Sequence, residues 1–141
     1  MEPENNSALL ELAARIEAAG GPSKALDREI ALAVGWVRQT PSEARRKHPA
    51  WFHPDDCRDG EVVFDSLHGT DVWRDPLPYT TSIDAALTLV PEGAFWSITM
   101  RGESRPGFHA CCQLDGPLDW REGATAPLAL CAAALRAKAA Q

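Results

Sequence analysis

The hydrophobic positions near both ends of the chain recur every three or four residues, which is the spacing of one face of a helix. Near the N-terminus this pattern predicts two helices, separated by the Gly20-Gly21-Pro22 break. Near the C-terminus it predicts one helix that is rich in alanine. Ser23 and Thr125 are suitable N-caps for the second and the last of these helices. The predicted helices cover residues 7–19, 23–37 and about 125–139.

Between these helices the pattern changes to the two-residue alternation of strands. Residues 94–100 and 108–114 alternate in this way, and the link between them suits a hairpin. Residues 118–121 are expected to form a short third strand. A further helix is predicted to precede the hairpin, with Thr81 as its N-cap and Asp84 three residues later, as in a capping box.

Residues 38–78 follow neither pattern, because prolines interrupt them throughout. Charged and aromatic side chains are frequent here, and only brief strands are predicted, at residues 61–64 and 71–73. Long segments of this kind are often functional. We therefore predict a single α+β domain over residues 1–141, with a long insertion at about 38–78.

Charge and composition narrow the classes of function. Lys plus Arg is 14 and Asp plus Glu is 20, so the formal net charge is 14 − 20 = −6. We expect no duplex nucleic acid as a partner, because phosphate contacts need a basic field. No apolar run is long enough to cross a membrane, and the acidic N-terminus lacks the apolar core of a signal peptide. We expect a cytoplasmic protein with reduced cysteines and no membrane partner.

Four segments together carry a resemblance to a known family. They are Leu-Asp-Arg-Glu-Ile at 26–30, Gly35-Trp36, residues 79–87 followed by Trp96 in a strand, and the alanine-rich residues 124–135. In this order they resemble the phage ABA sandwich family, whose members are small bacteriophage and prophage proteins. The resemblance covers residues 20–37 and 79–139.

This resemblance implies an antiparallel β-sheet sandwiched between α-helices, an α/β/α sandwich, in a phage protein of the infected bacterial host's cytoplasm. Some anti-Thoeris sponges, which hold a cyclic ADP-ribose-type immune signal without cleaving it, are similar to this group. A homo-oligomer is expected of such sponges. One departure concerns the last helix, where relatives often carry an Arg after the cysteine and this chain has Ala132. That substitution puts the anion ligand of the relatives in doubt here.

Metal binding and catalysis are weakly indicated. His48, His53 and Cys57 have no regular ligand spacing, and the neighbouring Cys111 and Cys112 point to opposite faces of a strand. Asp55 and the acidic residues around Cys57 disfavour a thiolate, and they lack the spacing of a calcium loop. We therefore expect no metal, no cofactor and no catalytic residue.

A binding site without catalysis fits the residues better. A nucleotide needs an aromatic ring against its base, arginines for its phosphates and polar groups for its ribose. A helix N-terminus adds free amides for an anion. The predicted ligand-binding residues are Trp73, Arg74, Tyr79, Thr80, Thr81, Ser82, Arg101 and Arg105. In the alternative interpretation, Trp73 and Tyr79 anchor the loop to the core and Thr81 only caps a helix.

We predict from these observations a non-catalytic phage protein that binds and sequesters a nucleotide-derived bacterial immune signal, of the cyclic ADP-ribose or cyclic oligonucleotide type. Sequestration would counter the host's anti-phage defence. The alternative is a structural or protein-interaction phage protein that has no small-molecule ligand.

Overall fold

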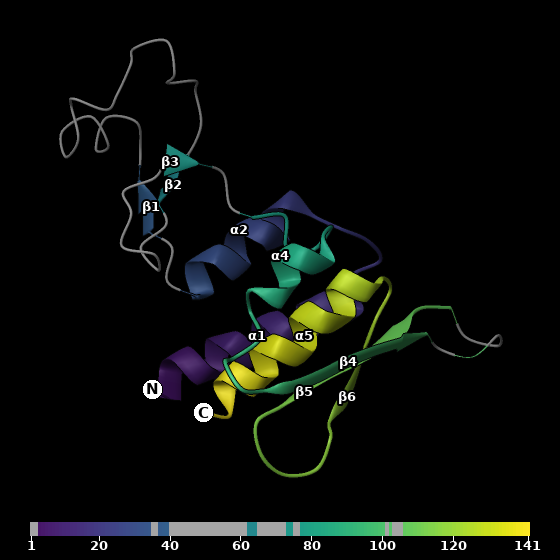
Figure 1. Cartoon of the computed structure of the whole chain (residues 1–141). Coiled ribbons are helices and arrows are strands. Elements are labelled where there is room, and N and C mark those ends of the chain that lie inside the picture. The colour runs from purple at the N-terminus through teal and green to yellow at the C-terminus, as the bar shows by residue number, and fades with distance from the viewer. Residues whose placement is uncertain are drawn as a thin grey trace.

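Two helices from opposite ends of the chain pack side by side at the centre of the fold (Figure 1). They are α1 (Pro3–Ala18) and α5 (Ala126–Ala139). This computed structural model describes residues 3–34, 37–39, 62–64, 73–74, 77–100, 102 and 106–141. Helices α2 (Lys24–Ala33) and α4 (Ile83–Leu87) pack in the same helical layer.

Two of the predicted N-caps are confirmed. The Ser23 hydroxyl accepts a hydrogen bond from the Leu26 N–H, and the Thr125 hydroxyl accepts one from the Leu128 N–H. Each of these bonds satisfies a backbone donor that has no partner within its own helix.

The prediction for α4 was wrong by one residue, because Ser82 and not Thr81 is its N-cap. The Ser82 hydroxyl accepts a hydrogen bond from the Ala85 N–H. The backbone N–H groups of Thr81 and Ser82 both donate to the Pro78 carbonyl, so a turn occupies the position where the helix was expected to begin.

The predicted helix over residues 23–37 was too long. Helix α2 has Val34 as its C-cap, and Val37 belongs to strand β1 (Val37–Gln39). β-branched valines near the end of the pattern favour this early stop. Strands β2 (Val62–Phe64) and β3 (Trp73–Arg74) pair antiparallel with β1 in the order β1-β2-β3. Both lie at the positions where brief strands were predicted.

The larger sheet is antiparallel, in the order β4-β5-β6. Its strands are β4 (Phe95–Met100), β5 (Phe108–Gln113) and β6 (Trp120–Gly123). The predicted hairpin is confirmed, while the third strand lies two residues beyond its predicted start. Cys111 pairs with Ser97 on one side and with Trp120 on the other, which fixes the register.

Helices pack against one face of this sheet, so the predicted α+β class is confirmed. This inner face carries Ala110 and Cys112, which are buried, together with Ile98 and Phe108, which pack against the same core. The helices that the structure describes lie on this one side (Figure 1). The helical layer that the resemblance implies for the other face is not seen among the described residues.

Among the elements whose burial the structure describes, helix α5 is the most enclosed, and its buried residues point in all directions around its axis. They are Leu128, Ala129, Leu130, Cys131, Ala132, Ala133, Ala134, Leu135 and Ala139. The alanines have short side chains, so α1 and the sheet can both approach closely. Within the described residues, no helix is both long and apolar enough to cross a membrane.

Strand β6 approaches α5 closely at Gly123. A Cβ atom added at Gly123 would lie 2.7 Å from the Ala129 Cα and nearer still to the Ala129 backbone nitrogen. We therefore expect Gly123→Ala to lower the free energy of unfolding by about 1–3 kcal/mol, because the backbone of α5 would have to move. Urea denaturation followed by circular dichroism measures this change.

Gly20→Ala is the matched control, because a Cβ atom there meets nothing within 4 Å. It should change the free energy of unfolding by no more than about 1 kcal/mol. Equal effects of the two substitutions would contradict the close packing of β6 on α5.

Candidate functional site

Thr80, one of the predicted ligand-binding residues, is 1% exposed and bonds within the protein. Its hydroxyl donates to the Asp27 carboxylate at 2.8 Å and accepts from the Ser23 N–H at 2.9 Å. Its backbone N–H also donates to Asp27, at 2.8 Å. Asp27 is buried as well, so these bonds satisfy one oxygen of a carboxylate that is largely removed from water. Thr80 therefore ties the segment before α4 to the first turn of α2.

Tyr79 is also in the core and is 2% exposed. The Cys131 thiol donates to the Tyr79 carbonyl, with 3.2 Å between the sulfur and the oxygen. Burial, and secondarily the charge of Asp27, raises the pKa of Cys131 to about 12. This position agrees with the alternative interpretation, in which Tyr79 anchors the loop to the core.

The remaining predicted ligand-binding residues differ in how much of them the structure describes. Thr81 is exposed, and the Ser82 hydroxyl is used as the cap of α4. Trp73 and Arg74 form β3, but their side chains lie outside the described part of the structure. Arg101 and Arg105 lie outside the described residues altogether. Among the described positions, Tyr79, Thr80 and Ser82 make contacts within the fold.

A different part of the structure forms a cavity of about 440 Å³. It lies between the C-terminal half of α5 and the sheet, at the connection from β5 to β6. This volume is within the range of about 300–1,000 Å³ that is typical of small-molecule sites. Its lining residues are Cys112, Gln113, Leu114, Asp115, Pro117, Asp119, Arg121, Ala133, Arg136, Ala137, Ala140 and Gln141.

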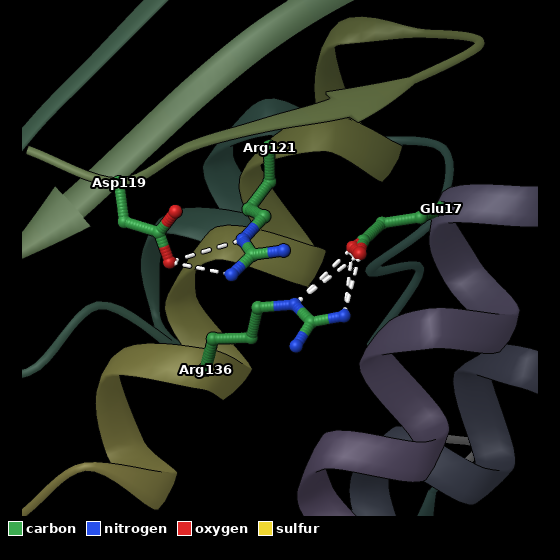
Figure 2. A network of polar contacts seen from close by, with 4 residues as sticks. All are labelled: Glu17, Asp119, Arg121 and Arg136. Carbon is green, nitrogen blue, oxygen red and sulfur yellow. Dashed lines mark hydrogen bonds and ion pairs between the residues drawn. The ribbon is translucent and has the colours of Figure 1, made fainter.

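Two arginines from different elements meet at this cavity. Arg121 comes from β6, where it pairs with Ala110 on the inner face of the sheet, and Arg136 comes from α5. Figure 2 shows the two guanidinium groups between two carboxylates, those of Asp119 and Glu17. In each arginine, Nε and Nη2 form the ion pair, and Nη1 makes no hydrogen bond to another described residue.

The two ion pairs differ in exposure and therefore in strength. Arg136 binds both oxygens of Glu17, at 2.7–3.2 Å, and the two side chains are only 21% and 19% exposed. This pair joins α5 to α1 and fixes the Arg136 guanidinium. Arg121 binds one oxygen of Asp119 at 2.8 Å, and these side chains are 34% and 51% exposed. An exposed pair contributes only about 0–1 kcal/mol, so another anion can compete for Arg121.

The cavity also contains a thiol, that of Cys112. Burial, followed by the neighbouring Cys111, raises the pKa of Cys112 to about 11. The thiol is therefore protonated at neutral pH, and the thiolate is the form that acts as a nucleophile. Cys112 contributes a small, weakly polar wall to the cavity.

The candidate metal ligands are not brought together within the described residues. Cys111 and Cys112 face opposite sides of the sheet, and His109 lies 3.5 Å from the Glu122 carboxylate. His48, His53 and Cys57 are outside the described residues. In the part of the chain that is described, no group of three or more His, Cys, Asp or Glu side chains is placed to hold a metal.

Arg121 and Arg136 are not among the ligand-binding residues predicted from the sequence. One local signal was present, because Arg136 and Lys138 are the charged residues of a helix whose other positions are apolar. Arg121 alternates onto the same face of the sheet as the buried Ala110, where a charged side chain is unusual. Their convergence depends on tertiary packing.

Comparison of the chain with protein-family models, with curated proteins and with solved structures gives no match. The resemblance to the phage ABA sandwich family therefore stays a prediction.

The structural role of Thr80 is tested by Thr80→Val, which keeps the side-chain shape and removes the hydroxyl. We expect this substitution to lower the free energy of unfolding by about 1–3 kcal/mol, because Asp27 stays buried with one donor fewer. Thr81→Val, at the exposed neighbouring position, should change it by less than about 0.5 kcal/mol. Thermal denaturation of both variants measures the difference, and similar melting temperatures would contradict the assignment.

The buried Cys131 thiol predicts a loss of stability at alkaline pH. Its pKa rises from the ordinary value of 9.0 to about 12 in the folded state. Below pH 9 the Cys131 thiol is protonated in both the folded and the unfolded chain, so its ionisation does not reduce the free energy of unfolding. Between pH 9 and 12 only the unfolded chain ionises, so the free energy of unfolding falls as the pH rises.

Cys131→Ser isolates this contribution, because a serine hydroxyl can still donate to the Tyr79 carbonyl and does not titrate in this range. Urea denaturation at a series of pH values from 8 to 11 should give a shallower decline for Cys131→Ser than for the unsubstituted protein. Parallel curves would show that Cys131 ionises equally in both states.

Proposed function

We propose that the protein binds a small nucleotide-type molecule in the cavity between Arg121 and Arg136 and does not transform it. The observation that carries the proposal is the convergence of two arginines, from a strand and a helix, on one cavity of about 440 Å³. Planar guanidinium groups bind phosphate oxygens through paired hydrogen bonds. In each arginine the Nη1 nitrogen makes no hydrogen bond to a described residue, so it can donate to a phosphate oxygen.

The balance of charge in the cavity favours a ligand that carries both acceptors and donors. Asp115 and Asp119 line it together with the two arginines, so a simple inorganic anion would meet as many carboxylates as guanidinium groups. A nucleotide has phosphates for the arginines. It also has ribose hydroxyls and base N–H groups that donate to carboxylates. Its base can stack on a guanidinium plane, as bases do on arginines in RNA complexes.

Sequestration without catalysis is the mode of action that we propose. The protonated Cys112 thiol is a poor nucleophile, which supports binding over covalent chemistry. A protein that only binds lowers the free concentration of its ligand by mass action, so it must be present in amounts similar to that ligand. With the resemblance described above, we propose that the ligand is a nucleotide-derived immune signal and that the protein acts in the cytoplasm of a phage-infected bacterium, as a homo-oligomer.

A protein-interaction role without a small-molecule ligand is the second candidate. It is favoured by large apolar side chains on the surface of β4, among which Phe95 is 55% exposed and Met100 is 74% exposed. Such side chains on a surface are typical of contacts between proteins.

The ligand hypothesis predicts that intact ligand can be recovered from the protein. The purified chain is incubated with cyclic ADP-ribose isomers and with cyclic di- and trinucleotides, separated from free ligand and heat-denatured. We expect one class of these compounds to be released unchanged, as identified by chromatography and mass spectrometry. Release of an altered compound would overturn binding without catalysis. Failure of every compound to bind at micromolar concentration would overturn the nucleotide-signal function.

Substitutions locate the site in the same assay. Arg121→Gln should weaken binding about tenfold or more with little loss of stability, because its ion pair is exposed. Arg28→Gln is the matched control, since Arg28 is an exposed arginine on α2, away from the cavity. Arg74→Ala tests the ligand-binding segment that was predicted from the sequence. Loss of binding in Arg74→Ala alone would move the site away from the cavity.

A further inference from the structure

Strand β4 has an open edge, which is the side that faces away from β5. In the sheet order β4-β5-β6 it pairs only with β5 among the described residues. Its residues Phe95–Met100 pair without interruption along all six positions. A regular strand of this length leaves a row of backbone N–H and C=O groups on its open side that can pair with another strand.

Among the described residues, the β4 edge lacks the devices that normally prevent such pairing. Proteins protect sheet edges with charged side chains, prolines, bulges or short strands. The sequence of β4, Phe-Trp-Ser-Ile-Thr-Met, contains no charge and no proline, and its register contains no bulge. At the opposite edge of the sheet, β6 has four residues, two of which are the charged Arg121 and Glu122. The contrast singles out β4 as the edge that is open to a partner.

Apolar surface is concentrated on the same strand. Phe95, Trp96 and Met100 are 55%, 42% and 74% exposed. Trp96, Ile98 and Met100 share the inner face of the sheet, because they pair with Cys112, Ala110 and Phe108. A strand that pairs with β4 would therefore extend the sheet and cover these side chains at once.

We propose that this partner is a second copy of the chain, joined edge to edge through β4. This inference rests on the homo-oligomer in the proposed function and names the strand that forms it. A two-fold axis perpendicular to the sheet makes the two β4 strands antiparallel and keeps both helical layers on the same side. Trp96, Ile98 and Met100 then meet the same residues of the partner, and the two three-stranded sheets become one of six strands.

The uncharged β4 strand and the charges that flank it favour a second copy of the chain as the partner. Each chain has a formal net charge of −6, so two copies repel each other at most surfaces, but β4 itself is uncharged. In the sequence, Glu92 precedes the strand, whereas Arg101, Glu103 and Arg105, which together carry a formal charge of 2 − 1 = +1, follow it. Antiparallel pairing brings the acidic end of one strand to the basic end of the other, whereas parallel pairing would bring like charges together.

The area of the proposed interface indicates how tightly the dimer should bind. The three exposed side chains present roughly 300–400 Å² per copy, since each has about 200 Å² in all. A stable interface buries about 800 Å² per partner. The backbone hydrogen bonds of the new strand pair must therefore contribute, and the dimer should dissociate in the micromolar range.

Sedimentation equilibrium over a range of concentrations tests the proposal with a matched pair of variants. Trp96 on β4 and Trp120 on β6 are almost equally exposed, at 42% and 43%, and each lies on an edge strand. Trp96→Lys should raise the dimer dissociation constant about tenfold or more, because it places two like charges across the new strand pair. Trp120→Lys, which makes the same chemical change, should leave it unaltered.

Thr99→Lys keeps the test valid if Trp96→Lys fails to fold, because Thr99 is exposed on the outer face of β4. It should weaken the dimer as Trp96→Lys does. Equal weakening by Trp120→Lys, or a dimer unaffected by both β4 variants, would overturn the β4 interface and leave self-association intact. An unsubstituted protein that is monomeric up to millimolar concentration would overturn both the interface and the homo-oligomer.

Hydrogen exchange gives an independent measurement on the unsubstituted protein. The amides of β4 that face away from β5 should be protected at high concentration and should exchange after dilution. Protection that does not depend on concentration would mean that this chain covers its own edge, which would overturn the proposal.

Discussion

The close approach of α5 to its neighbours is the constraint on which the rest of the structure depends. Helix α5 is buried on nearly every side, by α1 on one side and by the sheet on the other. Alanine and glycine make this possible, since Gly123 and Ala129 bring a strand and a helix nearly into backbone contact. Dispersion attraction is strongest at such short separations, so small residues compensate for their small apolar area by close packing.

The cavity lies at the C-terminal end of the same helix. Helix α5 packs against β5 and β6, and near its end Arg136 lines the cavity. Strand β6 places Arg121 on the same face of the sheet, and α1 supplies Glu17 to hold Arg136. The arginines are therefore positioned by the elements that form the core, and binding there would need little reorganisation of the protein.

Local signals explain how much of the fold could be predicted from the sequence. Ser23 and Thr125 were identified as caps because a hydroxyl before an apolar run bonds to a backbone N–H three residues later. The hairpin could be predicted because apolar and polar residues alternate along both strands, and successive side chains of a strand point to opposite faces. The start of α4 was misplaced because Thr81 and Ser82 are both suitable caps, and the bonds of the preceding turn to Pro78 decide between them.

The candidate site could not be predicted because its contacts join distant parts of the chain. Thr80 has the hydroxyl that a ligand would need, but its partner Asp27 lies 53 residues earlier, and that bond directs Thr80 into the core. Arg136 and Glu17 are 119 residues apart, so neither indicates the other in the sequence. A polar side chain has the same local signature whether it binds a ligand or its own chain. The difference lies in whether a buried partner already satisfies it, as Asp27 does for Thr80, or whether it keeps an unused donor, as Arg121 and Arg136 do among the described contacts.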